Sequence, residues 1–191
     1  MERVVNAVER VRQRLLKATA ALQAAGVPYA VAGGNAVALW VSRVDEAAVR
    51  TTQDVDILVR RPSFHEARTA LEAAGFVYRH ERSIDGGGID AFLDDAQAKV
   101  RNAVHIIFAG ERVRPEEPVA NPDVTESEQA TDYRVLSLAA VVQIKLTAFR
   151  DKDRTHLRDL IDVGLLDATW LPRLPDSLAP RLKQLLDTPG G

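Results

Sequence analysis

The chain contains no cysteine among its 191 residues. That absence excludes disulfides, thiolate nucleophiles and cysteine-ligated zinc or iron–sulfur centres. The sequence also lacks any apolar run approaching the ~18 residues of a membrane span, and its N-terminal stretch has no signal-peptide core. We therefore expect a cytoplasmic protein that does not cross a membrane. A net charge of −2 gives no general attraction to nucleic acid or to anionic lipid.

The composition is that of an ordinary globular protein, with 46% hydrophobic and 27% charged residues. A chain of this length suits one domain, or one domain with a small appendage, and it can bury a core without covalent staples. We expect an α/β core over residues 1–120, including an N-terminal helix. Residues 121–191 are expected to form a connector and C-terminal helices packed on that core.

Apolar periodicity and turn residues predict the elements along the chain. Strands are expected over 29–32, 54–60, 76–80, 89–93 and 103–108. Helices are expected over 3–25, 36–41, 63–75, 137–149, 153–164 and 178–186. A turn is expected over 85–88, and an extended connector over 112–132. This order predicts an α/β (α+β) fold in which a mixed sheet is flanked by helices and covered by a C-terminal helical layer.

Two acidic residues stand on the strand over 54–60. Alternation along a strand places Asp54 and Asp56 on the same face, about 6.6 Å apart. Two such carboxylates repel one another, and a hard divalent cation such as Mg²⁺ would relieve the repulsion. A solvated strand edge is the simpler alternative. The run D-V-D-I-L-V is too apolar for an exposed edge, so the pattern favours a metal site.

A glycine pair lies between a short apolar strand and a helix. Gly33 and Gly34 allow a ligand to approach the backbone closely, and Asn35 stands at or near the N-terminal cap of the helix. A helix N-terminus favours bound phosphate. An ordinary tight turn would explain the glycines taken alone, whereas the neighbouring acids favour phosphate binding.

These motifs together resemble a known family. A Gly-Gly turn followed by R-x-T-x-D-x-D, here Arg50, Thr52, Asp54 and Asp56, is similar to nucleotidyltransferases of the DNA polymerase β type. The later stretch V-V-Q-I-K-L-T-A-F-R-D-K-D-R-T-H-L-R-D-L resembles the C-terminal helices of AbiEii-like nucleotidyltransferases of type IV toxin–antitoxin systems. The resemblance covers about residues 25 to 165.

The resemblance implies a reaction. A nucleoside triphosphate would bind near Gly33, Gly34 and Asn35, and Mg²⁺ or Mn²⁺ would bind at Asp54 and Asp56. A hydroxyl on a protein, an RNA or a small molecule would attack the α-phosphorus and release pyrophosphate. Lys145 would offer a cation to the triphosphate, although a helix-surface lysine is an equal alternative. An antitoxin partner and a homodimer are both compatible with the resemblance.

One position departs from the family's pattern. His105 stands where such enzymes commonly carry a third carboxylate on a later strand. A neutral histidine there could serve as a general base toward the acceptor hydroxyl, or it could be a core histidine bonded to backbone. Asp90 is a second candidate for the missing carboxylate. The alternative function is a catalytically impaired module of the same fold that binds a nucleotide or a partner.

Residues outside the motifs give weaker signals. Asp153 and Asp159 lie in an alternating-charge run, which is usually a solvated helix face, but the resemblance implies that they lie beside the site. His156 is expected to be structural. Several arginines could form a basic rim for an RNA acceptor, although scattered surface arginines are the commoner explanation. They are Arg60, Arg61, Arg79, Arg82, Arg101, Arg112 and Arg114.

Overall fold

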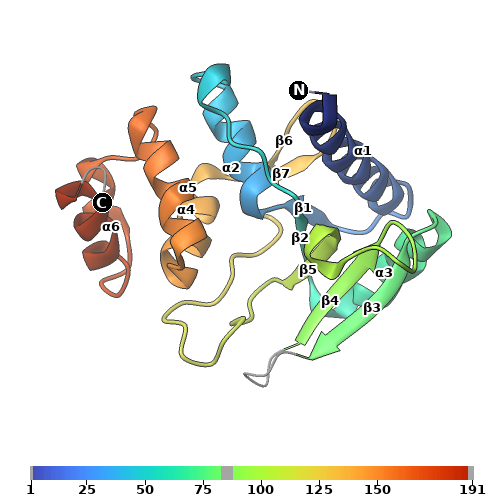
Figure 1. Cartoon of the computed structure of the whole chain (residues 1–191). Helices are drawn as coiled ribbons and strands as arrows, with labels where there is room; N and C mark the ends of the chain where they lie inside the picture. Colours follow the sequence, from blue (N-terminus) through green and yellow to red (C-terminus); the bar gives the residue numbers. More distant parts are fainter. Residues whose placement is uncertain (1, 83–87, 189–191) are drawn as a thin grey trace.

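The computed structural model describes residues 2–82 and 88–188, and Figure 1 shows their arrangement. Within these residues the strands are β1 (Tyr29–Val31), β2 (Val55–Val59), β3 (Val77–Arg82), β4 (Gly88–Leu93), β5 (Val104–Phe108), β6 (Ser127–Gln129) and β7 (Arg134–Leu136). The α-helices are α1 (Glu2–Ala24), α2 (Gly33–Ser42), α3 (Phe64–Ala73), α4 (Leu138–Ala148), α5 (Asp151–Asp162) and α6 (Ala179–Asp187).

The strands form one mixed sheet in the order β3-β4-β5-β2-β1-β7-β6. β2 and β5 run parallel at its centre, and their register places Asp56 opposite His105. β1 pairs antiparallel with β2 and parallel with β7. The predicted mixed sheet flanked by helices is therefore confirmed. Its central parallel pair brings together two residues that are far apart in the sequence.

The strand that carries the acids is buried at its apolar positions. Val55, Ile57, Leu58 and Val59 have no exposed surface, as expected of a strand with both faces covered. Leu15, Ala18 and Leu22 of α1 belong to the same core, whereas Val8 of that helix is exposed. Burying these side chains stabilises the fold and fixes β2 as a rigid support for its polar residues.

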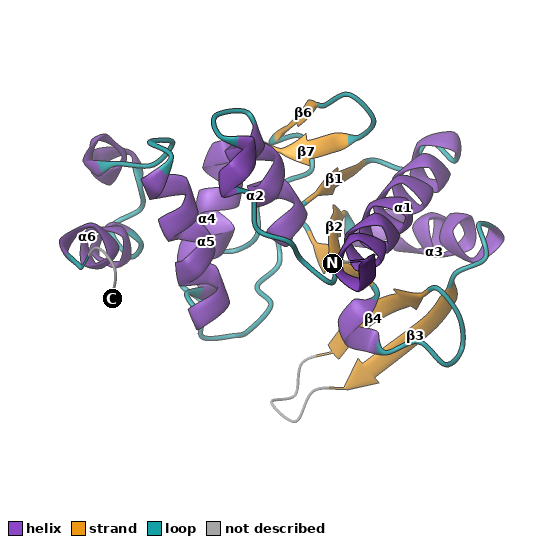
Figure 2. Ribbon diagram, turned by 45° about the horizontal axis from the view of Figure 1, so that its top comes forward, coloured by secondary structure: helices purple, strands orange, loops and turns teal. Residues whose placement is uncertain are grey.

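The C-terminal helices gather at the end of the molecule away from the β3–β4 hairpin (Figures 1 and 2). α4 packs against α5, and α2 packs against both of them. Buried leucines on α4, α5 and α6 join the main core. No helix among the described residues combines the length and the apolar character needed to cross a membrane.

Two short strands were not predicted. β6 lies inside the stretch 112–132 that was expected to be only a connector, and β7 follows it. Each is three residues long, and β6 reads Ser-Glu-Gln, so apolar alternation could not reveal it. The sheet takes strands from both sides of residue 120, while the division at that residue stays a prediction. The turn expected over 85–88 lies mostly outside the described residues, and Gly88 begins β4.

Candidate active site

A cavity of about 880 Å³ lies between the sheet and the helices α4 and α5. Asp54, Asp56 and His105 line it from the sheet side, together with Gly33 at the start of α2. The helical side contributes several charged residues, which are Lys145, Arg150, Lys152 and Asp153. The predicted glycine turn, the carboxylate pair and Lys145 therefore meet in one cavity.

The glycine turn is shaped by its contact with the carboxylate pair. Gly33 has a φ of +60°, which L side chains rarely adopt, and a Cβ there would overlap the Asp56 carboxylate. A Cβ on Gly34 would lie 2.9 Å from the Thr52 hydroxyl oxygen. The backbone at the start of α2 can thus touch the site only because these two side chains are missing.

Asn35 has a different place from the one predicted. α2 begins at Gly33 with Ala32 as its N-cap residue, so Asn35 does not cap the helix. Its side-chain amide donates a hydrogen bond of 2.8 Å to the backbone carbonyl of Asp54. Asn35 therefore ties the first turn of α2 to the strand that carries the acids.

Asp54 immediately precedes β2 and is anchored on two sides. The Thr52 hydroxyl donates a hydrogen bond to its Oδ1, and Lys152 Nζ lies 3.0 and 3.2 Å from its two oxygens. Burial raises the pKa of Asp54, but the Thr52 hydrogen bond and the Lys152 ammonium outweigh burial and hold that pKa below its ordinary value. The carboxylate is therefore ionised and already attracts a cation.

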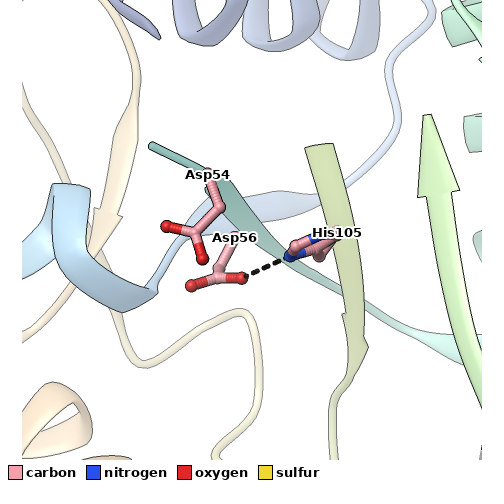
Figure 3. Close-up of side chains that lie close together, drawn as sticks. All are labelled: Asp54, Asp56 and His105. Carbon is pink, nitrogen blue, oxygen red and sulfur yellow. Dashed lines mark ion pairs between the residues drawn. The ribbon is translucent and has the colours of Figure 1, made fainter. Parts of the chain in front are cut away.

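His105 faces Asp56 across the parallel pair β2–β5, and its Nδ1 lies 3.4 Å from Asp56 Oδ1 (Figure 3). Its other ring nitrogen, Nε2, lies 2.7 Å from the Val100 carbonyl oxygen. Burial lowers the pKa of His105, but the Asp56 carboxylate and the Val100 carbonyl outweigh burial and raise it above its ordinary value. The histidine is thus bonded to backbone, as the core alternative expected, and also directed at the acids.

Asp54, Asp56 and His105 form a compact group. One ligand atom from each lies within 4.8 Å of the others, and all three side chains are half-buried. Figure 3 shows both carboxylates and the imidazole directed toward a shared space. Two carboxylates and one imidazole are a donor set that fits a divalent cation, because they supply charge, lone pairs and a partly desolvated position.

Asp90 does not belong to this group. The Tyr78 hydroxyl donates to its Oδ1 at 2.6 Å, and His80 Nδ1 lies 2.8 Å from the same oxygen. Asp90 lines another part of the cavity, so it does not replace the third carboxylate. Burial, followed by the Asp90 carboxylate, raises the pKa of Tyr78 to about 12.

The helical side of the cavity is held by ion pairs. Lys145 Nζ lies 2.8 Å from Asp153 Oδ1, and both side chains are buried. Arg150 binds the other oxygen of Asp153 at 2.8 Å. Asp159 of the same helix binds Arg50, the first residue of the R-x-T-x-D-x-D motif, at 2.7 Å. Asp153 lines the cavity, whereas Asp159 is joined to the R-x-T-x-D-x-D motif through Arg50.

Lys152 was not singled out from the sequence. It lies in the alternating-charge run of α5, a pattern that usually marks a solvated helix face. Its partner Asp54 is 98 residues earlier, so no local spacing could reveal the contact. Three of the arginines considered for a basic rim, Arg61, Arg112 and Arg114, also line the cavity.

Two solved structures have a similar fold. A solution structure of the antibiotic-resistance factor ANT(2'')-Ia matches with a TM-score of 0.54 and 15% identity, covering 95% of this chain and 91% of that one. A crystal structure of ANT(2'')-Ia in complex with adenylyl-2''-tobramycin matches with a TM-score of 0.45 and 16% identity, covering 93% and 87%. The first likeness supports the fold described above.

The sequence itself matches a family model. No individually curated protein matches the chain at a significant level. The model of the nucleotidyl transferase AbiEii toxin of type IV toxin–antitoxin systems matches residues 14–190, which include both sides of the cavity. This chain belongs to the AbiEii nucleotidyl transferase family.

Proposed function

We propose that this chain transfers a nucleoside monophosphate group from a nucleoside triphosphate to an acceptor hydroxyl, with Mg²⁺ or Mn²⁺ bound at Asp54 and Asp56. The observation that carries the proposal is the meeting of the glycine turn with this carboxylate pair, where the Gly33 backbone touches Asp56. A family whose model covers both halves of the cavity and is named for nucleotidyl transfer supports the same reaction.

The donor would lie along the start of α2. The first backbone N–H groups of a helix have no partner within it and favour phosphate, and Gly33 and Gly34 leave room for a close approach. A bound divalent cation would neutralise charge on the phosphate oxygens as pyrophosphate leaves. Lys145 and Lys152 place two further cations at the same cavity, where they can attract the triphosphate.

The reaction makes one bond and breaks one. The acceptor oxygen bonds to the α-phosphorus, the bond from the α-phosphorus to the bridging oxygen breaks, and pyrophosphate departs with that oxygen. The hydroxyl proton must leave in the same process and is released to water. His105 Nδ1 opens onto the space between the acids. His105 therefore provides an imidazole at the place where related enzymes commonly carry a third carboxylate.

The family and the nucleoside triphosphate donor together suggest the biological role and the cellular compartment. A role as the toxin of a type IV toxin–antitoxin pair, with an antitoxin as partner, is the proposal that the family supports. Nucleoside triphosphates are intracellular metabolites, so the proposed reaction is a cytoplasmic one. The proposed acceptor is a hydroxyl on a protein, an RNA or a small molecule. Arg112 and Arg114 at the cavity are compatible with an anionic acceptor such as RNA.

The test uses nucleoside triphosphates labelled at the α-phosphate. The chain is incubated with a divalent cation and, separately, with total RNA, cell protein and small metabolites. We expect label transfer to one fraction, lost by about a thousandfold in Asp54→Asn with Asp56→Asn. The matched control is Asp176→Asn with Asp187→Asn, which removes two exposed carboxylates elsewhere.

The impaired module gives a different result. Such a protein would be stabilised against heat by nucleotide and cation, yet would transfer no label to any fraction. His105 in the place of the third carboxylate is the observation that keeps this function as the second candidate. Transfer that survives in the double variant would overturn the proposed catalytic site.

A further inference from the structure

The orientation of the His105 ring is fixed by its backbone partner. A carbonyl oxygen only accepts hydrogen bonds, so the 2.7 Å contact with Val100 requires a proton on Nε2. In the neutral ring the lone pair is then on Nδ1, the atom that faces Asp56. This arrangement, in which one ring nitrogen is held by a carbonyl, is the one that prepares a histidine to bind a metal with the other nitrogen.

The position of the ring is fixed as well. His105 is the second residue of β5, paired with Asp56 in β2, and its side chain is only 16% exposed. Asp56 also packs against the start of α2, where a Cβ on Gly33 would overlap its carboxylate. These two contacts hold the three side chains together, so an ion bound by the two carboxylates would lie beside Nδ1 (Figure 3).

The chemistry of this donor set distinguishes between ions. Mg²⁺ binds oxygen ligands and dehydrates reluctantly, so an imidazole is a poor ligand for it. Mn²⁺ carries the same charge but accepts both carboxylate and imidazole ligands, and later transition metals accept imidazole more strongly still. Exchanging a third carboxylate for a histidine therefore removes one negative charge and makes the site less selective for Mg²⁺.

We propose that His105 Nδ1 is a direct ligand of the bound cation, and that the site consequently prefers Mn²⁺ to Mg²⁺. This inference rests on the proposed function, because it concerns the ion held at Asp54 and Asp56. It explains why a histidine could replace the usual carboxylate at position 105 without loss of catalysis. A histidine that acted only as a general base would leave ion binding independent of its side chain.

The test measures ion binding and needs no substrate. Mn²⁺ is titrated into the full chain and followed by the electron paramagnetic resonance of the free ion, and Mg²⁺ affinity is obtained by competition. Electron spin echo modulation then reports whether a nitrogen is bound to Mn²⁺. The variants are His105→Ala and His105→Asp. The control, His80→Ala, removes an imidazole that lines the same cavity but lies outside the group of three.

We expect nitrogen modulation in the wild type and in His80→Ala, and none in His105→Asp. The ratio of Mn²⁺ to Mg²⁺ affinity should fall at least about tenfold in His105→Asp, mainly because Mg²⁺ binds more tightly, and Mn²⁺ should bind at least about tenfold more weakly to His105→Ala. Circular dichroism checks that both variants fold.

The possible failures are distinguishable. Ion binding without nitrogen modulation, or an affinity ratio unchanged by His105→Asp, overturns the role of His105 and leaves the metal site at Asp54 and Asp56 standing. If neither ion binds to the wild type or to His105→Asp, the metal site fails, and the proposed function fails with it.

Discussion

The two sides of the cavity are built in different ways. On the sheet side, backbone hydrogen bonds and strand register hold the polar residues, because Asp56 is paired with His105 across β2 and β5. On the helical side, ion pairs hold the charged residues in place, because Lys145 and Arg150 both bind the buried Asp153. Substitutions on the sheet side should therefore reduce chemistry more than stability, whereas substitutions on the helical side should destabilise the fold.

The largest expected effect is on the helical side. Asp153→Asn leaves the buried Lys145 ammonium without its partner, which costs about 3 to 5 kcal/mol of unfolding free energy. Chemical denaturation measures this loss. Asp151→Asn is the control, because its pair with Arg154 is exposed and contributes less than about 1 kcal/mol. Equal losses of unfolding free energy in the two variants would contradict the claim that the buried ion pairs stabilise the helical side.

A second effect depends on pH. His156 of α5 is buried behind the glycine turn, and its burial, followed by the charges of Lys145 and Lys152, lowers its pKa to about 4. Because this folded-state pKa is below the ordinary value of about 6.5, the unfolded chain takes up the proton first as pH falls. Above about pH 6.5 His156 is neutral in both states and does not lower the free energy of unfolding. As the pH falls from about 6.5 toward about 4, the unfolded chain binds the proton more tightly, and the free energy of unfolding decreases.

The loss from His156 amounts to about 3 kcal/mol at about pH 4. His156→Gln cannot titrate, so its unfolding free energy should fall less steeply than that of the wild type over this range. Denaturant titrations at several pH values give the slopes. The exposed His65→Gln serves as the control and should follow the wild type. Identical slopes for wild type and His156→Gln would show that His156 is not kept neutral by the fold.

The sheet side is tested at its glycine. Gly33→Ala adds a methyl group where the Asp56 carboxylate lies, and the displacement should reduce transfer about 100-fold, equivalent to about 2.7 kcal/mol. Gly26→Ala is a matched control, because Gly26 has a similar φ of +67° but nothing within 4 Å of an added Cβ. Each variant should also lose about 1 kcal/mol of stability from backbone strain. Equal activities would show that contact with Asp56 is unimportant.

The smallest effect concerns the ion pair between Lys152 and Asp54, which joins the helical side of the cavity to the sheet side. Lys152 is half-exposed and binds both oxygens of Asp54, so Lys152→Met removes a cation that competes with a metal. Divalent-ion affinity should rise about fivefold, equivalent to about 1 kcal/mol. Lys183→Met, which removes an exposed ammonium on α6, should leave the affinity unchanged. Weaker ion binding in Lys152→Met would mean that Lys152 supports the ion instead of competing with it.

Much of the sheet side could be predicted from the sequence. Period-two alternation revealed β2 and β5, and the spacing of Asp54 and Asp56 placed both acids in one group. Those signals are local, because each depends on neighbours within one strand. β6 could not be predicted in this way, because a strand of three polar residues shows no alternation of apolar and polar residues.

The remaining parts of the site depend on contacts between distant residues. Lys152 reaches Asp54 across 98 positions, and Asp159 reaches Arg50 across 109. Local patterns assign both charges to a solvated helix face. Asn35 was expected near the cap of α2, but its bond to the Asp54 carbonyl depends on how that helix packs beside β2. Such contacts follow from the packing of elements, which the sequence pattern alone does not determine.

The most direct measurement is anomalous diffraction from crystals of the chain grown with Mn²⁺ and a non-hydrolysable nucleoside triphosphate analogue. We predict a manganese peak within coordination distance of the carboxylates of Asp54 and Asp56, with the triphosphate lying along the start of α2 at Gly33 and Gly34. A manganese peak elsewhere, or phosphates bound away from that turn, would contradict nucleotidyl transfer at this site.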